Sequence, residues 1–324
     1  MLNHKQQNFL AVAEAKCSST VFKRLYSLST DQKRDQHAMS LKDQLAGFVF
    51  FIGFAVVAMV HLAYIRPLAN SFPLLNVVDE IVIFVVCSLH LHMMTSDAGL
   101  IRRNSKGSTV VEQIQQSLTK VVQKNEAVPD LGRVCYTCWV DRPLRSKHCK
   151  ICDRCYDDFD HHCVFIRNCV GGGNRRAFFI YICSIPAALV LHAITLFVAF
   201  RVYLEEAAID EFLWAAFIFV MSWPLAIISL GFVCVFVPAV SMLVSIQTRS
   251  ILYNLSTNEM ANLHRYSHFW MSETSQVGDS GAVRVNQKFS NPFDRGPWQN
   301  WIDFWMRRPQ RPVCVSGGPN LHLI

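Results

Sequence analysis

Seven cysteines and three histidines lie between residues 135 and 169, and this density constrains the fold more than any other feature of the sequence. Two tetrahedral zinc sites of the structural kind need eight Cys or His ligands. Ten candidates are present, so two remain, and a nucleophilic cysteine beside a histidine base needs two. The count therefore predicts a scaffold built on two zinc ions that carries one reactive Cys/His pair.

The spacing of these residues is typical of zinc ligands. Thiols recur as Cys-x-x-Cys pairs with histidines beside them, which in a long chain favours metal binding over a disulfide framework. A loop rich in charged residues cannot bury a dry core by itself, so metal binding would supply folding free energy of about 10 kcal/mol or more per site. The candidate ligands are Cys135, Cys138, His148, Cys149, Cys152, Cys155, His161, His162, Cys163 and Cys169.

The run Asp160-His161-His162-Cys163 divides into roles by its chemistry. One histidine can complete a zinc site, while the other can take a proton from Cys163. The carboxylate of Asp160 can hold that imidazole in the required tautomer, as in other arrangements of nucleophile, base and orienting acid. The alternative is that Cys163 is one more zinc ligand of a purely structural module, but ten candidates exceed what two four-coordinate sites use.

Long apolar runs predict transmembrane helices. Hydrophobic residues make up 52% of the 324-residue chain, and each run reaches the ~20 apolar residues that a helix needs to cross a bilayer. Asp79 and Glu80 fall near the start of the second run, where a carboxylate costs less than at the bilayer centre, and Pro224 is expected to kink the fourth. We predict an all-α polytopic membrane protein with four transmembrane helices, near residues 45–65, 72–94, 178–200 and 212–243.

Lysine and arginine are distributed unevenly around these runs. They number 7 before the first run, 14 between the second and third, and 8 after the fourth, while the two remaining loops hold one each, Arg66 and Arg201. Because positive residues mark the cytosolic side of a membrane, both termini and the cysteine-rich loop are predicted to face the cytosol. The formal net charge of +7 is then a membrane-surface feature and needs no nucleic acid partner.

The predicted domain order follows from these assignments. In the tail, residues 272–290 are expected to be a loop. Trp298, Trp301, Phe304 and Trp305 recur at helical spacing after Pro297 and predict a short helix, which either lies in the membrane interface or packs on the protein. The domains are a cytosolic N-terminal segment (1–44), two transmembrane helices (45–95), a cytosolic loop (96–176) whose two-zinc cysteine-rich domain covers about 133–179, two further transmembrane helices (177–243) and a cytosolic tail (244–324).

The segment from Cys135 to Phe179 resembles the signature domain of the DHHC protein acyltransferases. The membrane layout, with two spans on each side of the zinc domain, is similar to that of the family. The tail is most like that of the branch with ankyrin repeats, although this sequence contains no such repeat. Three further motifs resemble those of the family, namely Asp97-Ala98-Gly99 after the second run, Ser256-Thr257-Asn258-Glu259 after the fourth, and Asn291 to Gly296 in the tail.

The resemblance implies an activity and its site. A palmitoyl or similar long-chain acyl group would pass from acyl-CoA, through a thioester on Cys163, to cysteine thiols of membrane-associated proteins, with His161 as the base and Asp160 orienting it. The protein would be a multi-pass protein of the endomembrane system, in the Golgi or the ER. Two structural zinc ions would be held by Cys135, Cys138, His148 and Cys155 in one site and by Cys149, Cys152, His162 and Cys169 in the other.

Basic residues of the loop are candidates for contacts with the phosphates of CoA, with an ordinary solvated charge as the alternative for each. The resemblance further implies that Glu259 braces the zinc domain against the tail and that Asn300 packs under the third and fourth spans. The candidate phosphate contacts are Arg142, Arg145, Arg175 and Arg176.

The sequence departs from the family at Val164 and Phe165, where the family has Pro and Trp after the nucleophile. Proline fixes φ near −65° and valine does not, so the nucleophile loop or the donor cavity is expected to differ. Two other classes stay open: a catalytically weak relative that acts as a membrane zinc-finger adaptor, and a membrane-anchored zinc module of the ubiquitin-ligase type. The second class needs a further Cys-x-x-Cys pair, which is absent after Cys155.

Overall fold

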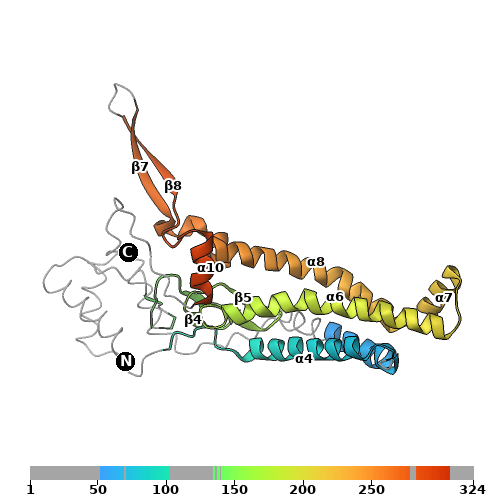
Figure 1. Ribbon diagram of the computed structural model, residues 1–324. Coiled ribbons are helices and arrows are strands. Elements are labelled where there is room, and N and C mark those ends of the chain that lie inside the picture. Colours follow the sequence, from blue (N-terminus) through green and yellow to red (C-terminus); the bar gives the residue numbers. More distant parts are fainter. Residues whose placement is uncertain are drawn as a thin grey trace, which may run out of the picture.

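The computed structural model describes residues 52–68, 71–102, 134–135, 137–138, 140–277 and 282–306. Its main body is a bundle of long helices that carries a cysteine-rich domain at one end (Figure 1). Among the described residues, three helices are long and apolar enough to cross a membrane, so the chain is that of a membrane protein. They are α4 (Pro73–Thr95), α6 (Arg175–Glu206) and α8 (Pro224–Leu252), and α6 packs against both of the others.

The first predicted span is described only from Ile52. A helix runs over Ile52–Ile65, and its last residues, His61–Ile65, wind as the π-helix η1 before the 3-10 turn η2 (Arg66–Leu68). Residues 45–51 of this span and the N-terminal segment 1–44 lie outside the described residues. This first helix would bring the number of membrane crossings to four, so the four-span layout stays a prediction.

The last predicted span is wrong in its extent. The apolar run from Phe212 forms two helices, α7 (Phe212–Ser222) and α8, and Trp223 between them is not helical, with φ −121° and ψ 48°. Pro224 is the cause, because proline disfavours the helical conformation of the preceding residue but fits the first turn of a new helix. The predicted kink is a complete break, and α8 continues past the predicted boundary at residue 243 to Leu252.

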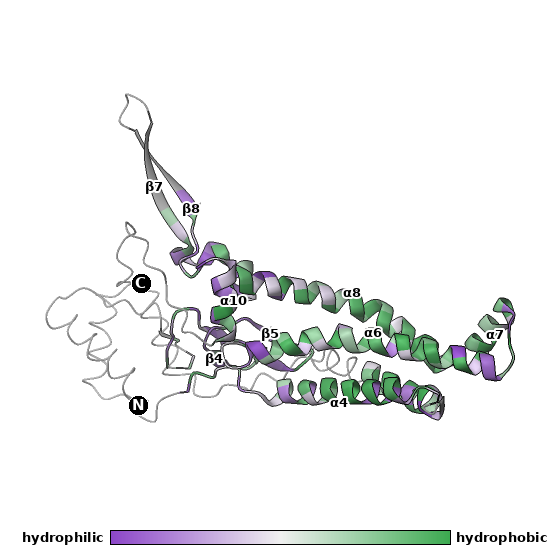
Figure 2. Cartoon of the chain, in the orientation of Figure 1, coloured by the Kyte–Doolittle hydropathy of each residue, from purple (hydrophilic) through white to green (hydrophobic). Residues whose placement is uncertain are grey.

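Hydrophobic residues predominate along the helices of the bundle (Figure 2), and many of their side chains are exposed. Phe84 on α4, Phe197 on α6 and Met242 on α8 are 72%, 65% and 66% exposed. Extended exposed apolar surface marks contact with a membrane or a partner, and the length of these helices favours lipid.

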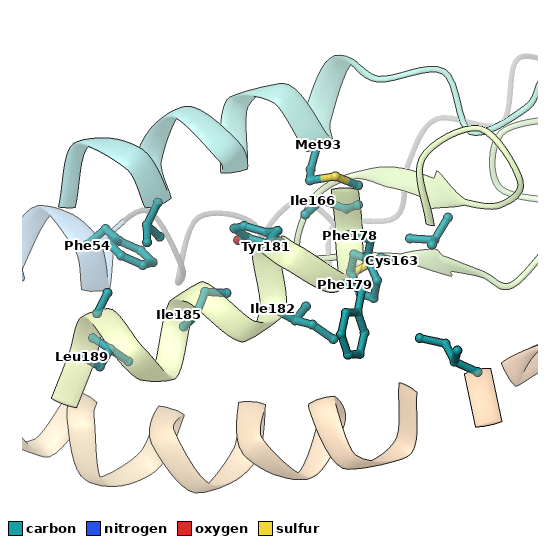
Figure 3. Packing of buried hydrophobic residues seen from close by; sticks show 14 of the residues in the cluster. Phe54, Met93, Cys163, Ile166, Phe178, Phe179, Tyr181, Ile182, Ile185 and Leu189 are labelled. Atoms are coloured by element: carbon teal, nitrogen blue, oxygen red, sulfur yellow. The ribbon is translucent and has the colours of Figure 1, made fainter. Parts of the chain in front are cut away.

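The interior of the bundle is a large apolar cluster between α4, α6 and α8 (Figure 3). Ile182, Ile185 and Leu189 recur along α6 at the spacing of one helix face, and each is at most 2% exposed. Met93 near the end of α4 joins them, and so does Cys163 from the cysteine-rich domain. This thiol therefore lies at the end of the apolar interior that adjoins the cysteine-rich domain.

The cysteine-rich domain consists of short antiparallel hairpins. Strands of two or three residues are too short to be stable alone, so these hairpins need links between the side chains they carry. The predicted all-α fold holds for the bundle and not for this domain. The pairs are β1 (Val134–Cys135) with β2 (Val140–Asp141), β3 (Lys147–Cys149) with β4 (Arg154–Tyr156), and β5 (His161–Cys163) with β6 (Asn168–Val170).

The tail contains a hairpin that the sequence analysis did not predict. After α9 (Thr257–Ala261) and the turns η3 (Leu263–Arg265) and η4 (Ser267–Phe269), strands β7 (Trp270–Val277) and β8 (Ala282–Phe289) pair antiparallel and project away from the bundle (Figure 1). The expected loop over residues 272–290 is wrong. Val283 and Val285 on β8 alternate with polar residues in the sequence, as in a strand.

The predicted aromatic helix is confirmed as α10 (Pro297–Trp305). Trp301, Phe304 and Trp305 surround Phe179 of α6, with ring centroids 5.9, 6.2 and 6.0 Å from its ring. Packing on the protein therefore accounts for three of the four aromatic residues, while Trp298 is 77% exposed. Asn300 donates to the carbonyl of Leu252 at 2.7 Å, so it packs under the end of α8, one of the two helices expected.

Candidate metal centres and candidate active site

Eight cysteine and histidine side chains gather into two groups of four, each with its ligand atoms within 4.8 Å of one another. The second hairpin serves both groups, because His148 lies opposite Cys155 for the first group while Cys149, next to His148, belongs to the second. The third hairpin places His162 opposite Cys169. The groups therefore interleave, and they are Cys135, Cys138, His148 and Cys155, and Cys149, Cys152, His162 and Cys169.

The donor atoms of both groups fit a tetrahedral zinc ion. In the first group, Nδ1 of His148 lies 3.3 Å from the sulfur of Cys138 and 3.8 Å from that of Cys155. In the second, Nδ1 of His162 lies 3.3 Å from the sulfur of Cys152, and that sulfur lies 3.5 Å from the sulfur of Cys169. Bonds of about 2.3 Å to sulfur and 2.1 Å to nitrogen set tetrahedral ligands roughly 3.5–3.8 Å apart. Both groups could therefore hold zinc.

Cys163 belongs to neither group. It lies on β5 two residues after His161, whose ring is close enough to lower the pKa of its thiol. Nδ1 of the same ring lies 2.7 Å from Oδ2 of Asp160. The structure thus brings together a thiol, an imidazole and a carboxylate, the three groups of a nucleophile, its base and an orienting acid.

The electrostatics of this trio favour a charged thiolate. Burial alone would raise the pKa of the Cys163 thiol, but His161 and the backbone N–H groups of Ile166 and Phe165 outweigh burial and lower it. Burial would lower the pKa of His161, yet its bonds to Asp160 and Cys163 raise it to about 9. Both shifts stabilise a pair of Cys163 thiolate and His161 imidazolium.

Asp160 is fully buried and is held by residues from outside the cysteine-rich domain. The backbone N–H and the hydroxyl of Thr257 each donate to its carboxylate at 2.8 Å, and the side-chain amide of Gln247 donates at 3.1 Å. The guanidinium of Arg175 lies 3.4 Å away. Although burial raises the pKa of Asp160, Arg175, His161 and the Thr257 N–H lower it well below its usual range. The carboxylate is therefore ionised and accepts the Nδ1 proton of His161.

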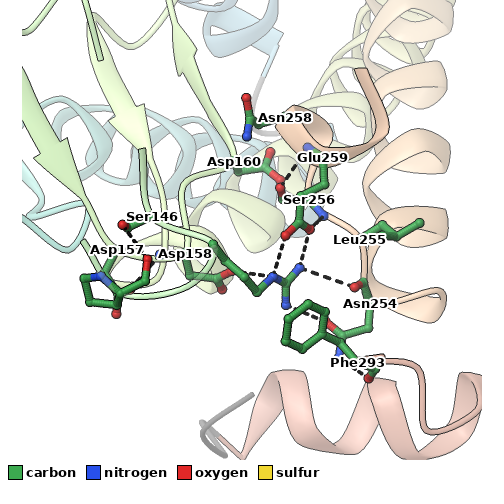
Figure 4. Close-up of polar contacts among 12 residues, drawn as sticks. Ser146, Asp157, Asp158, Asp160, Asn254, Leu255, Ser256, Asn258, Glu259 and Phe293 are labelled. Carbon is green, nitrogen blue, oxygen red and sulfur yellow. Dashed lines mark hydrogen bonds and ion pairs between the residues drawn. The ribbon is translucent and has the colours of Figure 1, made fainter. Parts of the chain in front are cut away.

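Arg145 and Glu259 form a buried ion pair between the cysteine-rich domain and the tail (Figure 4). Nε and Nη2 of Arg145 donate to the two oxygens of Glu259 at 2.8 and 2.6 Å, and Nη1 donates to Asn254 at 2.9 Å. The expected brace by Glu259 is confirmed. The side chain of Arg145 is 3% exposed, and its donors face protein groups, which argues against a contact with CoA phosphates.

The other arginines considered for CoA lie in different surroundings. Arg175 is buried and donates to the hydroxyl of Ser250 at 2.6 Å, so it too is committed to the protein. Arg176 is half-buried and donates to the carbonyl of Phe304 at 3.3 Å, while Arg142 is half-buried after β2. Phosphate contacts by Arg142 and Arg176 stay predictions.

A glycine turn that the sequence analysis did not single out seats α4 against the cysteine-rich domain. A Cβ atom at Gly171 would lie 2.5 Å from the carbonyl oxygen of Ala98, and one at Gly173 would lie 2.3 Å from that of Asp97. A side chain cannot be accommodated at either distance, so the backbones meet only because these residues are glycine. Three consecutive glycines from Gly171, two positions after the last ligand Cys169, were the available sequence signal.

The loop after the nucleophile forms a tight turn without proline. The carbonyl of Val164 accepts the backbone N–H of Arg167 at 3.3 Å, and Arg167 adopts φ 51°. Phe165, two positions after Cys163, is 45% exposed, so its apolar ring faces outward.

The fold and the site define a class: membrane proteins whose cysteine-rich domain presents one thiol, beside a histidine and an aspartate, at the end of a helical bundle. Residues 129–264 match the family described as DHHC palmitoyltransferase. They therefore belong to the DHHC protein S-acyltransferase family.

Similar relatives carry palmitoyltransferase names. Palmitoyltransferase ZDHHC17 of Danio rerio is 29% identical over 243 residues, which cover 68% of this chain and 33% of the relative. Palmitoyltransferase akr1 of Aspergillus oryzae is 35% identical over 156 residues, 47% of this chain and 19% of the relative. Palmitoyltransferase ZDHHC4 of Mus musculus is 30% identical over 214 residues, 61% of this chain and 58% of the relative. The matched part thus spans from about a fifth to less than two thirds of these relatives.

Proposed function

We propose that the protein is a protein S-acyltransferase that moves a long-chain acyl group, palmitoyl above all, from acyl-CoA to cysteine thiols of membrane-associated proteins. The observation that carries the proposal is the position of Cys163. Its thiol lies outside both groups of potential metal ligands and is paired with His161, which Asp160 holds at 2.7 Å. The names of the relatives support the same activity.

The proposed reaction has two transfers. The Cys163 thiolate attacks the carbonyl carbon of the acyl-CoA thioester while its former proton resides on His161. The bond to the CoA sulfur breaks, and the departing CoA thiolate takes that proton from the His161 imidazolium. His161 then accepts the proton of a substrate thiol, which attacks the Cys163 thioester and leaves Cys163 as a thiolate again. Asp160 keeps the imidazole in one tautomer throughout.

The surroundings of Cys163 suit a donor with a long alkyl chain. The thiol joins the apolar cluster between the helices, while β5 on its other side belongs to the polar domain. The acyl chain of the donor can therefore remain among apolar side chains while its CoA part stays in water. Each buried CH₂ contributes about 0.8 kcal/mol, so a sixteen-carbon chain is a tightly bound donor.

We further propose that the two ligand groups hold structural Zn²⁺ ions. Each group offers four protein ligands, which leaves no open position for a reactant, as in structural rather than catalytic sites. Zinc bound there would join the short hairpins and so fix the strand that carries Cys163. The reaction itself needs no step on either ion.

The proposed membrane arrangement has four spans across the Golgi or ER membrane. Both termini and the cysteine-rich domain lie on its cytosolic side. The distribution of lysine and arginine supports this orientation. A glycosylation acceptor inserted after Arg201 is therefore expected to be modified, and one inserted near Ser280 is not. The opposite pattern would contradict the orientation. Co-localisation with Golgi and ER markers tests the choice of membrane.

The test of the activity is labelling in cells with an alkyne analogue of palmitate. The wild-type protein should carry label that hydroxylamine removes, and Cys163→Ser should not. Cys183→Ser is the matched control, because Cys183 is a half-buried thiol on α6 outside the site, and it should keep the label. An adaptor is not favoured, since Cys163, His161 and Asp160 are assembled. Label that persists in Cys163→Ser would contradict the proposed nucleophile.

A further inference from the structure

A second cluster of ionisable side chains lies inside the bundle, remote from Cys163. His61 comes from η1, Asp79 from α4 and His192 from α6, and their exposed fractions are 3%, 0% and 0%. Asp79 precedes the cytosol-facing end of α4 at Thr95 by sixteen positions, a rise of about 24 Å in a helix. Ionisable residues buried between membrane helices are costly, and they commonly mark a functional site. The π-helical winding that carries His61 is also enriched at such sites.

The contacts of His61 require a proton on each of its ring nitrogens. Its Nδ1 lies 3.0 Å from Oδ2 of Asp79, and its Nε2 lies 3.2 Å from Oε1 of Glu80. Carboxylates accept hydrogen bonds, so both ring nitrogens must donate and the ring is an imidazolium. Arg66 lies 4.0 Å from Glu80, so two positive and two negative groups balance there. Glu80 is 39% exposed and connects the cluster to the surface.

His192 is different, because one of its ring nitrogens, Nδ1, lacks a hydrogen-bond partner. Its Nε2 lies 3.5 Å from the hydroxyl of Ser229 on α8, and that hydroxyl donates its own proton to the carbonyl of Ala226 at 2.9 Å. Ser229 can therefore only accept from His192, which places the proton of a neutral ring on Nε2. The Nδ1 lone pair then faces Oδ2 of Asp79 at 3.8 Å, and Nδ1 has no hydrogen-bond partner.

We propose that the gap between His192 and Asp79 is a proton-binding site. Two acceptors face each other there, and a proton taken up on Nδ1 forms an N–H bond that points at the carboxylate. The resulting imidazolium donates to Asp79 and adds a charge-assisted hydrogen bond between α4 and α6. The proton comes from water through the exposed Glu80 side of the cluster. The charged and titratable groups that face the site are His61, Arg66, Asp79, Glu80 and His192.

A proton suits the site better than a metal ion. Among the described residues, the sets of three or more His, Cys, Asp or Glu ligands that converge within 4.8 Å are the two groups of the cysteine-rich domain. His61, Asp79 and His192 are not such a set, since Asp79 lies between the two rings. The proposal gives the bundle a property that the acyl transfer does not require. The added bond forms only when the proton is taken up, so it stabilises the bundle at lower pH and is lost as pH rises.

The test compares apparent thermal unfolding midpoints of the full-length protein in lipid nanodiscs at pH 6 and pH 8, with zinc present throughout. The quantity compared is the change in midpoint between the two pH values. Acidification should favour the wild type over His192→Gln and over Asp79→Asn by on the order of 3 °C. The control is His264→Gln, which removes an exposed histidine of the tail and should respond like the wild type.

Ser229→Ala keeps the test decisive if the other variants do not fold. Without the Ser229 hydroxyl, neutral His192 can place its proton on Nδ1 toward Asp79 and needs no further proton, so the pH response should also disappear. An unchanged pH response in these variants would overturn the proposal. So would a midpoint that rises with added Zn²⁺ at constant pH in the wild type but not in His192→Gln, because the ligand would then be a metal ion.

Discussion

The cysteine-rich domain and the helical bundle are stabilised in opposite ways. The domain has strands of two or three residues, and side chains that could bind zinc join its hairpins. The bundle has long helices that bury apolar side chains such as Phe178 and Leu189 and expose others outward. Cys163 belongs to both, since its strand is part of the domain and its thiol is part of the apolar cluster. The comparison teaches that the reactive group sits where a polar scaffold meets an apolar interior.

The seam between the two regions is polar and positions the proposed catalytic trio of Asp160, His161 and Cys163. Asp160 of the domain accepts bonds from Gln247 at the end of α8 and from Thr257 of α9, while Arg145 of the domain binds Glu259 of α9. Activity is therefore expected to depend on both regions and on the contacts between them. The following changes separate these three contributions, from the largest expected effect to the smallest.

Removing one potential metal ligand should have the largest effect. Cys138→Ala takes a ligand from the first group, and because the second hairpin serves both groups, both metal sites should be weakened. Metal binding contributes about 10 kcal/mol or more of folding free energy per site, so zinc, protease resistance of the domain and acylation should be lost together. Metal analysis and limited proteolysis measure this, with Cys87→Ser on α4 as the control. A folded, active Cys138→Ala protein with full zinc would rule out the ligand set.

Breaking the ion pair at the seam should come next. Arg145→Met leaves the Glu259 carboxylate buried without its partner, which costs about 3–5 kcal/mol, whereas the double change Arg145→Met and Glu259→Leu should cost less. The onset of thermal unfolding and the retention of zinc measure the loss. Equal stability of the single and double variants would show that the pair does not join the two regions.

Removing the base should change how acyl loading depends on pH. In the wild type the lowered pKa of Cys163 keeps the thiolate present at neutral pH, so loading should rise less between pH 7 and pH 9 than for a free thiol of pKa ~8.5. In His161→Gln the side chain that most lowers the pKa of the thiol is lost, so this pKa rises, and loading at pH 7 should fall about 100-fold and recover as pH increases. Rates of acyl-enzyme formation across this range measure both. Parallel pH profiles for the two proteins would exclude His161 as the base.

Weakening the support of Asp160 should have the smallest effect. Gln247→Leu removes one of several bonds to the carboxylate and leaves those of Thr257, so loading should fall about tenfold with zinc content unchanged. Gln299→Leu, which removes an amide bonded to Asp303 on α10, is the control. If Gln247→Leu loses zinc as well, the residue supports the fold rather than the orientation of His161.

The functional residues of the cysteine-rich domain were more predictable than the contacts that the domain makes with the rest of the protein. Thiol and imidazole spacing pointed to two metal groups and a surplus Cys163, and the resemblance supplied the interleaved pairing that the hairpins show. The burial of Arg145 was not predictable, because a charged residue in the sequence does not reveal a distant partner such as Glu259. Gln247 lies 87 positions from Asp160, so its contact depends on the packed fold.

The bundle was predictable in its helices and not in their interruptions. Apolar length located α4, α6 and α8, but the break at Trp223 depends on how Pro224 acts on the residue before it. The sequence assigns no role to His192 and indicates for Asp79 only a charge that is tolerated near the start of a span. Their pairing was not predictable, because it joins helices that are far apart in the sequence.

The most direct test of the central claim is intact mass spectrometry of the purified protein after mixing with palmitoyl-CoA, with zinc measured in the same sample. The wild type should gain one acyl group that hydroxylamine removes, and it should contain two zinc ions, one for each ligand group. Cys163→Ser should gain no acyl group and keep both ions. A Cys163→Ser protein that still gains the acyl group would contradict the account, because Cys163 would not be the nucleophile. Loss of about half of the zinc would contradict it as well, because Cys163 would then be a metal ligand.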